Sequence, residues 1–203
     1  MIAGLEPGAV AGFLGAGLLL NLTPGADVMF ASASGLAGGP RAGVAAAFGV
    51  ALGGLMHACL AAAGLAALLA AAPTLFTALR YLGAAYLLLL AVKAWQAGPA
   101  EPRTGAARLT QAIRRGFLTN ALNPKVALFV LAFLPQFTNP ETGPVWLQIL
   151  LLGALFSTTG FFVTAGYGAL AGLAGAGLTR AGGWLNRLAA VVFGLLALRL
   201  VFD

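Results

Sequence analysis

The first polar interruption in this chain lies at residues 21–27, between two long apolar runs, and contains Asn21, Pro24, Gly25 and Asp27. Proline cannot donate a backbone hydrogen bond and glycine weakens a helix, so the pair predicts a broken helix. Asp27 is the one acid that falls within a predicted apolar span. A carboxylate at membrane depth is a candidate functional group, either exchanging protons or pairing with a substrate ammonium. Alternatively, Asp27 caps backbone N–H groups that the break leaves free, and both roles can coexist.

The second interruption follows about a hundred residues later and contains Asn120, Asn123, Pro124 and Lys125. Lys125 could hold a substrate carboxylate or pair with Asp27, or its long side chain could snorkel to the membrane surface. A broken helix also exposes N–H groups at one end, which suit a carboxylate, and carbonyls at the other, which suit an ammonium. A zwitterionic amino acid needs both kinds of partner. Paired breaks in the two halves of a chain predict a transporter binding site, and these eight residues are its candidate members.

Three further polar residues lie inside apolar runs and are secondary candidates: His57, Ser157 and Thr158. His57 could shuttle protons, but a lone histidine in a span is more often a hydrogen-bonded core residue. Ser157 and Thr158 could line a cavity or bond back onto their own helix carbonyls. The single cysteine, Cys59, cannot form an internal disulfide, and we expect it to be a small core residue.

The composition predicts an integral membrane protein. The chain has 203 residues, of which 61% are hydrophobic and 8% charged, and its mean hydropathy is +0.97. A span needs about 20 apolar residues, so this length allows six or seven helices and no soluble domain. The net charge of +6 does not indicate a nucleic-acid partner, because the basic residues are spread over loops. No phosphate-binding loop, nucleophile triad or metal-ligand cluster is apparent, so we expect neither an enzyme, nor a cofactor, nor a metal site.

The apolar runs predict an all-α membrane protein with six spans at 7–36, 42–70, 74–95, 116–137, 145–178 and 184–201. We expect one transporter domain with a first repeat at 1–96, a cytoplasmic loop at 97–115 and a second repeat at 116–203. With three spans each, the two repeats would be inverted, with helices 1 and 4 carrying the breaks. Glycines four residues apart, such as Gly49 and Gly53, favour close helix packing. They are compatible with a homodimer without predicting one.

The distribution of basic residues predicts the orientation. Loops one, three and five carry eight Lys and Arg residues, whereas the opposite side carries two. Basic residues stay on the cytoplasmic side. Both termini should therefore lie outside, on the non-cytoplasmic side of a bacterial cytoplasmic (inner) membrane. No basic residue precedes the first run, so we expect a retained helix and not a cleaved signal peptide.

Three motifs resemble the lysine exporter family, also called LysE/RhtB. Residues 21–27 with Gly-Gly-Pro-Arg-Ala-Gly at 38–43 are similar to its N-terminal signature. Residues 115–125 with Phe-Leu-Pro-Gln-Phe at 133–137 resemble its second signature, and residues 81–88 its third-span pattern. The resemblance covers nearly the whole chain and implies a six-span inner-membrane exporter of amino acids or their derivatives, driven by the proton gradient. Gly53 and Gly54 depart from the acid or amide of many relatives, so substrate choice or proton coupling could differ here.

We therefore expect a secondary transporter that exports amino acids across the cytoplasmic membrane by proton antiport. Its expected partners are the amino acid, protons and the lipid bilayer. The alternatives are an exporter of another solute such as a metal ion, a passive channel, or a structural membrane subunit. A thiol-relaying membrane enzyme is disfavoured, because that chemistry needs two cysteines and the chain has one.

Overall fold

The computed structural model describes residues 4–71 and 108–174, together with a few isolated helical positions between 78 and 96 and between 190 and 198. The elements of the two continuous segments are all helical. We call residues 4–71 the N-terminal segment and residues 108–174 the C-terminal segment. The predicted third and sixth spans lie almost wholly outside the described residues, so the six-helix inverted repeat stays a prediction.

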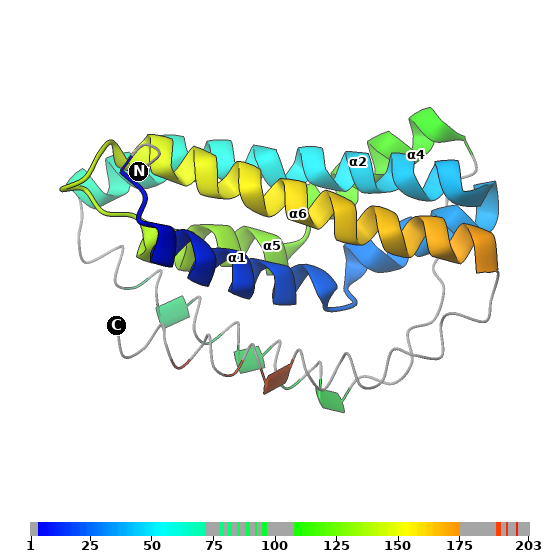
Figure 1. Ribbon diagram of the computed structural model, residues 1–203, viewed down its shortest axis with the longest axis horizontal. Helices are drawn as coiled ribbons and strands as arrows, with labels where there is room; N and C mark the ends of the chain where they lie inside the picture. Colours follow the sequence, from blue (N-terminus) through cyan, green and yellow to red (C-terminus); the bar gives the residue numbers. More distant parts are fainter. Residues whose placement is uncertain are drawn as a thin grey trace.

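The N-terminal segment contains two helices separated by the predicted break. Helix α1 (Pro7–Leu22) ends before Pro24, and α2 (Ala26–Ala71) begins just after Gly25. Inside α2, Gly39 has φ 78° and ψ 179°, a conformation that favours glycine, and Pro40 follows it. Figure 1 shows α2 turning back on itself there, which gives it a first arm and a longer second arm. The break predicted at Pro24 and Gly25 is therefore confirmed, and the turn at Gly39 and Pro40 lies in the gap between the predicted spans 7–36 and 42–70.

The C-terminal segment begins with a second broken helix. Helix α4 (Leu109–Ala121) and helix α5 (Pro124–Leu128) flank the predicted break. A π-helical stretch, η1 (Phe129–Phe133), and a 3₁₀ turn, η2 (Leu134–Phe137), continue α5. The two parts of this pair are bent by 51°. After the predicted loop at 138–144, α6 (Val145–Ala174) runs as one helix of 30 residues.

Up to three stretches of the described chain have the length and apolar composition of membrane spans. Two are long enough to cross a bilayer, at Ala26–Gly64 and Val145–Leu173, and a third candidate is the bent pair Leu109–Ala121 with Pro124–Phe137. Helix α1 is apolar but has only 16 residues. A helix of 16 residues spans about 24 Å, less than the roughly 30 Å hydrocarbon core, so α1 would need the chain beyond the break to complete a crossing.

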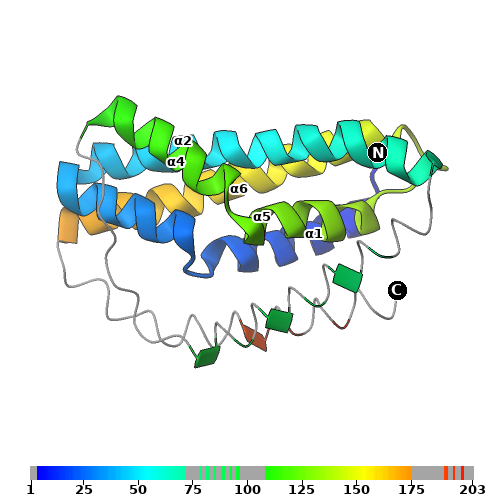
Figure 2. The ribbon, with the colours of Figure 1, turned by 180° about the vertical axis from the view of Figure 1, so that it is seen from behind.

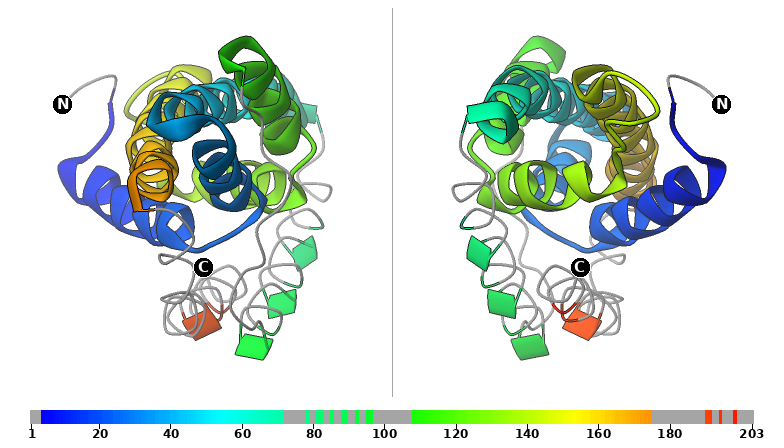
Figure 3. Two further views of the ribbon diagram at one scale, coloured as in Figure 1. Left: turned by 90° about the vertical axis from the view of Figure 1, so that its right-hand side faces the viewer. Right: turned by 90° about the vertical axis from the view of Figure 1, so that its left-hand side faces the viewer.

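The bundle is closed by aromatic packing at one end and by glycine contacts along α2. Phe13 of α1 is fully buried among Phe129, Phe137 and Phe156, with ring centroids 5.5 Å from Phe137. Helices α2 and α6 cross at glycines, where a side chain on Gly43 would collide with the backbone of Gly168. Figure 3 shows the bundle end-on, with the first arm of α2 among its second arm, α4 and α6.

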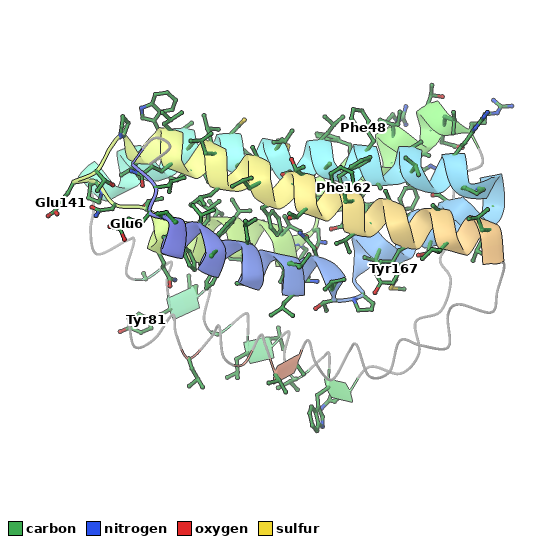
Figure 4. All side chains as sticks on the ribbon, viewed as in Figure 1. Glu6, Phe48, Tyr81, Glu141, Phe162 and Tyr167 are labelled. Carbon is green, nitrogen blue, oxygen red and sulfur yellow. The ribbon has the colours of Figure 1, made fainter. Side chains whose placement is uncertain are left out.

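The two ends of the bundle carry different charges. Figure 4 shows Glu6 and Glu141 together at one end. The turn of α2 and the start of α4 lie at the other end (Figures 1 and 2). By sequence, those two segments carry Arg41, Arg108, Arg114 and Arg115. The described part of the chain therefore has the charge asymmetry on which the predicted orientation depends.

Candidate functional site

The first break is closed by a side chain from the C-terminal segment. Pro24 has no N–H group, so the Leu20 carbonyl four residues earlier loses its helical donor. The Lys125 ammonium donates to that carbonyl at 3.0 Å and to the Thr23 carbonyl at 3.3 Å. Lys125 is thus turned into the bundle and does not snorkel to a membrane surface. Its positive charge also offsets the negative end of the α1 dipole.

At the second break, the freed carbonyl has one partner from its own segment and one side-chain partner from the N-terminal segment. Pro124 leaves the Asn120 carbonyl without its helical donor, and that carbonyl instead accepts from the Asn123 N–H at 2.8 Å. His57 Nε2 lies 3.1 Å from the same oxygen. His57 is 8% exposed and therefore buried beside a hydrogen-bond partner. The Asn123 side chain meanwhile accepts from the Lys125 N–H at 3.0 Å and caps the start of α5.

Asp27 connects the two breaks directly. It occupies the first turn of α2, where the helix dipole favours a negative charge. Its Oδ2 accepts hydrogen bonds from the side-chain amides of Asn120, at 2.9 Å, and Asn123, at 3.1 Å. Asp27 also interacts electrostatically with Lys125. Four residues predicted from two stretches a hundred positions apart therefore meet, and Figure 2 shows both interruptions side by side near the middle of the bundle.

Asn21, just before the first break, anchors α1 to α6. Its side-chain amide donates to the Phe156 carbonyl and to Thr159 Oγ1, both at 3.3 Å. Ser157 lines the space beside the breaks, whereas Thr158 is exposed and donates to the Ala154 carbonyl of its own helix. The two secondary candidates on α6 therefore separate, since adjacent helical residues point about 100° apart.

One small cavity collects these groups. Its lining includes all the primary candidates except Pro24 and Pro124, together with apolar side chains from α1, α2, α5 and α6. The cavity has a volume of about 30 Å³, room for about two water molecules. Ligand pockets in proteins usually measure at least several hundred Å³, so a whole amino acid does not fit in the conformation described. The two prolines act on the backbone and not on the cavity surface.

Sequence reasoning missed part of the cavity wall and misplaced one residue. The missed residues include Phe156 and Thr164 of α6, which are 4% and 3% exposed. Val50 and Ala51 of α2 also line the cavity. Helical spacing from Ser157 reaches Thr164 at seven residues, a signal that could have found it. Cys59, expected in the core, is exposed on α2. Residues 57 and 59 lie on different faces of a helix, so the burial of His57 places Cys59 outside.

Comparison with known proteins identifies the family. The family described as "LysE type translocator" matches residues 18–203. A membrane protein of Vibrio cholerae is 35% identical over 157 residues, 76% of each chain. A protein of Salmonella typhimurium named homoserine/homoserine lactone efflux protein is 32% identical over 75% of each chain. An Enterobacter protein named leucine efflux protein is 33% identical over 69% of this chain and 68% of its own. No solved structure matches. The resemblance noted in the sequence is confirmed, and the chain belongs to the LysE family of translocators.

Proposed function

We propose that this protein exports neutral amino acids across the cytoplasmic membrane, and that the cavity between the two broken helices binds the substrate. One observation carries the proposal: both breaks, with Asp27, Lys125, Asn120 and Asn123, line a single cavity. Binding at paired broken helices is the arrangement that secondary transporters use. Relatives named for efflux of homoserine, homoserine lactone and leucine support an amino acid substrate.

The charges around the cavity favour a substrate without net charge. One carboxylate, Asp27, and one ammonium, Lys125, line the cavity and interact electrostatically. The α1 carbonyls bind Lys125 and the first turn of α2 holds Asp27, so the site has no excess of either sign. A zwitterion adds one charge of each sign and keeps this balance. A cationic or anionic amino acid would bring one extra buried charge, which is costly without a partner.

Transport requires the cavity to open, because about 30 Å³ cannot hold an amino acid. Movement of the N-terminal segment against the C-terminal segment would open it to one side of the membrane at a time. Asp27 exchanges a proton in this cycle, and His57, which also interacts electrostatically with Asp27, is the second candidate for proton exchange. In this proposal, export is coupled to proton entry by antiport. Both termini lie outside, on the non-cytoplasmic side of the inner membrane.

Proteoliposomes with an imposed pH gradient test the function. Purified protein is reconstituted with a panel of amino acids, and their movement is followed with and without an uncoupler. Gradient-dependent movement of neutral amino acids is expected. Movement that ignores the gradient would indicate a passive channel and remove the proton role of Asp27. If no amino acid moves while a divalent metal ion does, the amino acid proposal is wrong.

The orientation is tested separately by labelling single cysteines from outside intact cells. In a Cys59→Ala background, a cysteine at Glu6 or at Glu141 should react with a membrane-impermeant maleimide. A cysteine at Arg41 should react only after the cells are permeabilised. The opposite pattern would reverse the predicted orientation without affecting the transport proposal.

A further inference from the structure

Three buried oxygen atoms in the cavity have no hydrogen-bond partner within the described residues. They are Oδ1 of Asp27, Oδ1 of Asn120 and Oγ of Ser157. Asn120 is 3% and Ser157 5% exposed, and all three residues line the cavity. Most buried polar atoms in proteins are hydrogen-bonded, so three unpaired oxygens around one cavity need an explanation. A fourth such atom, on Gln136, belongs to a residue outside the cavity lining.

Two of these oxygens lie against adjacent residues of α2. A Cβ atom on Gly53 would lie 2.8 Å from Asn120 Oδ1, and a Cβ atom on Gly54 would lie 2.7 Å from Ser157 Oγ. The absence of side chains on α2 is what lets both oxygens approach it. The side-chain orientation of Asn120 is fixed by its amide nitrogen, which donates to Asp27 Oδ2. Exchanging the amide nitrogen and oxygen of Asn120 would place two acceptor oxygens against each other, at Asn120 and at Asp27 Oδ2. Asn120 Oδ1 is therefore correctly assigned as one of the three unpaired oxygens.

The chemistry of this trio selects its ligand. One member carries a negative charge and two are neutral oxygens, so the complementary group is a small cation with several N–H donors. A primary ammonium has three donors and one positive charge. The cavity volume of about 30 Å³ is enough for such a group but not for a whole amino acid.

From this geometry we infer that Asp27, Asn120 and Ser157 form the subsite for the α-ammonium group of the substrate. The inference rests on the proposed function and makes it more specific. Transport then requires a free, protonated amino group. The substrates are primary amines of amino acid size, and N-acylated derivatives are excluded.

The test measures ligand-induced thermal stabilisation of the purified, detergent-solubilised protein by its tryptophan fluorescence. Two series of compounds are used, one based on leucine and one on homoserine. Leucine methyl ester and homoserine lactone keep the ammonium and lack the carboxylate. N-acetyl-leucine and N-acetyl-homoserine keep the carboxylate and lack the ammonium. We expect stabilisation by at least one parent amino acid, weaker stabilisation by its carboxylate-free analogue, which brings a net positive charge, and none from the N-acetyl compounds.

A matched pair of variants connects the effect to the subsite. Ser157→Ala removes one unpaired oxygen and should weaken binding of the stabilising amine about tenfold, as one hydrogen bond to a charged group would. Thr158→Ala removes the neighbouring hydroxyl, which is exposed and bonded to its own helix, and should leave binding unchanged. The ligand series on the unmodified protein remains decisive if Ser157→Ala does not fold.

Three results would overturn the inference. Equal stabilisation by an N-acetyl compound and its parent would mean that the ammonium is not recognised, although amino acid export would stand. Stabilisation by sodium chloride but not choline chloride, lost in Ser157→Ala, would assign the oxygens to a metal cation instead. No stabilisation by any of the six compounds would remove the subsite. Only the proteoliposome panel decides whether amino acids move at all.

Discussion

Replacing Asp27 by asparagine separates its charge from its hydrogen bonds. The asparagine oxygen can still accept from the amides of Asn120 and Asn123, which now lie 2.9 and 3.1 Å from Oδ2. The variant should therefore fold and keep the two breaks joined. What it loses is the negative charge and the unpaired acceptor Oδ1, which becomes an NH2 group, and with them the attraction for a substrate ammonium.

The expected magnitudes differ sharply for folding and for transport. Two charge-assisted hydrogen bonds become neutral ones, a loss of about 1 kcal/mol each, which the release of a buried charge offsets. The net change in the free energy of unfolding should stay within about 2 kcal/mol. An ammonium at about 4 Å from the carboxylate interacts by about 4 kcal/mol at an effective dielectric constant of 20. Losing that term should weaken substrate binding roughly a thousandfold.

Asp27→Ala provides the contrast, because it leaves both amide donors unpaired at a cost of about 1–3 kcal/mol each. Thermal unfolding in detergent should rank the unmodified protein and Asp27→Asn close together, with Asp27→Ala clearly below. In proteoliposomes both variants should be inactive. Transport by Asp27→Asn at the unmodified rate would refute the reasoning, since the hydrogen bonds alone would then suffice. A large loss of stability in Asp27→Asn would show that the charge is structural.

Three further substitutions test the cavity and the breaks. Gly54→Ala places a methyl group against the serine hydroxyl in the cavity and should reduce transport at least tenfold, whereas Gly64→Ala, which faces open space on the same helix, should transport normally in the same assay. Pro24→Ala restores the N–H that the broken helix lacks; we expect unchanged or higher thermal stability and slower transport, and a faster rate would contradict a role for the break. His57→Ala removes the side chain 3.1 Å from the Asn120 carbonyl, and thermal unfolding should show a loss of about 1 kcal/mol that His57→Gln partly restores.

The sequence was most informative where the chemistry of a single residue fixes the local backbone structure. Pro24 and Pro124 cannot donate a backbone hydrogen bond, so both breaks could be predicted without any tertiary information. The turn at Gly39 and Pro40 falls between the predicted first and second spans, and Gly39 adopts the positive φ that glycine favours. The charged residue beside each break, Asp27 or Lys125, could be assigned to the site because an ionised group at membrane depth needs a partner.

The sequence could not reveal which side chain meets which break. Three roles for Lys125 were open, and its bonds to the α1 carbonyls depend on how α5 lies against α1. Likewise, Ser157 and Thr158 are adjacent and chemically alike, and only the rotation of α6 decides that the first faces the cavity. The burial of Phe156 and the exposure of Cys59 follow from the same kind of information, which helix packing supplies and composition does not.

The two breaks are closed reciprocally, and this limits how the protein can move. Proline frees the Leu20 carbonyl in the N-terminal segment, and Lys125 of the C-terminal segment binds it. Proline frees the Asn120 carbonyl in the C-terminal segment, and His57 of the N-terminal segment reaches it. Any motion that separates the segments at the cavity must therefore give up bonds to buried carbonyls at both breaks. The Asn120 carbonyl keeps its bond from the Asn123 N–H, but the Leu20 carbonyl would lose the Lys125 ammonium as a donor, so water or substrate has to enter as the cavity opens. A substrate that supplies both donors and acceptors would lower the cost of opening, whereas an apolar solute of the same size would not.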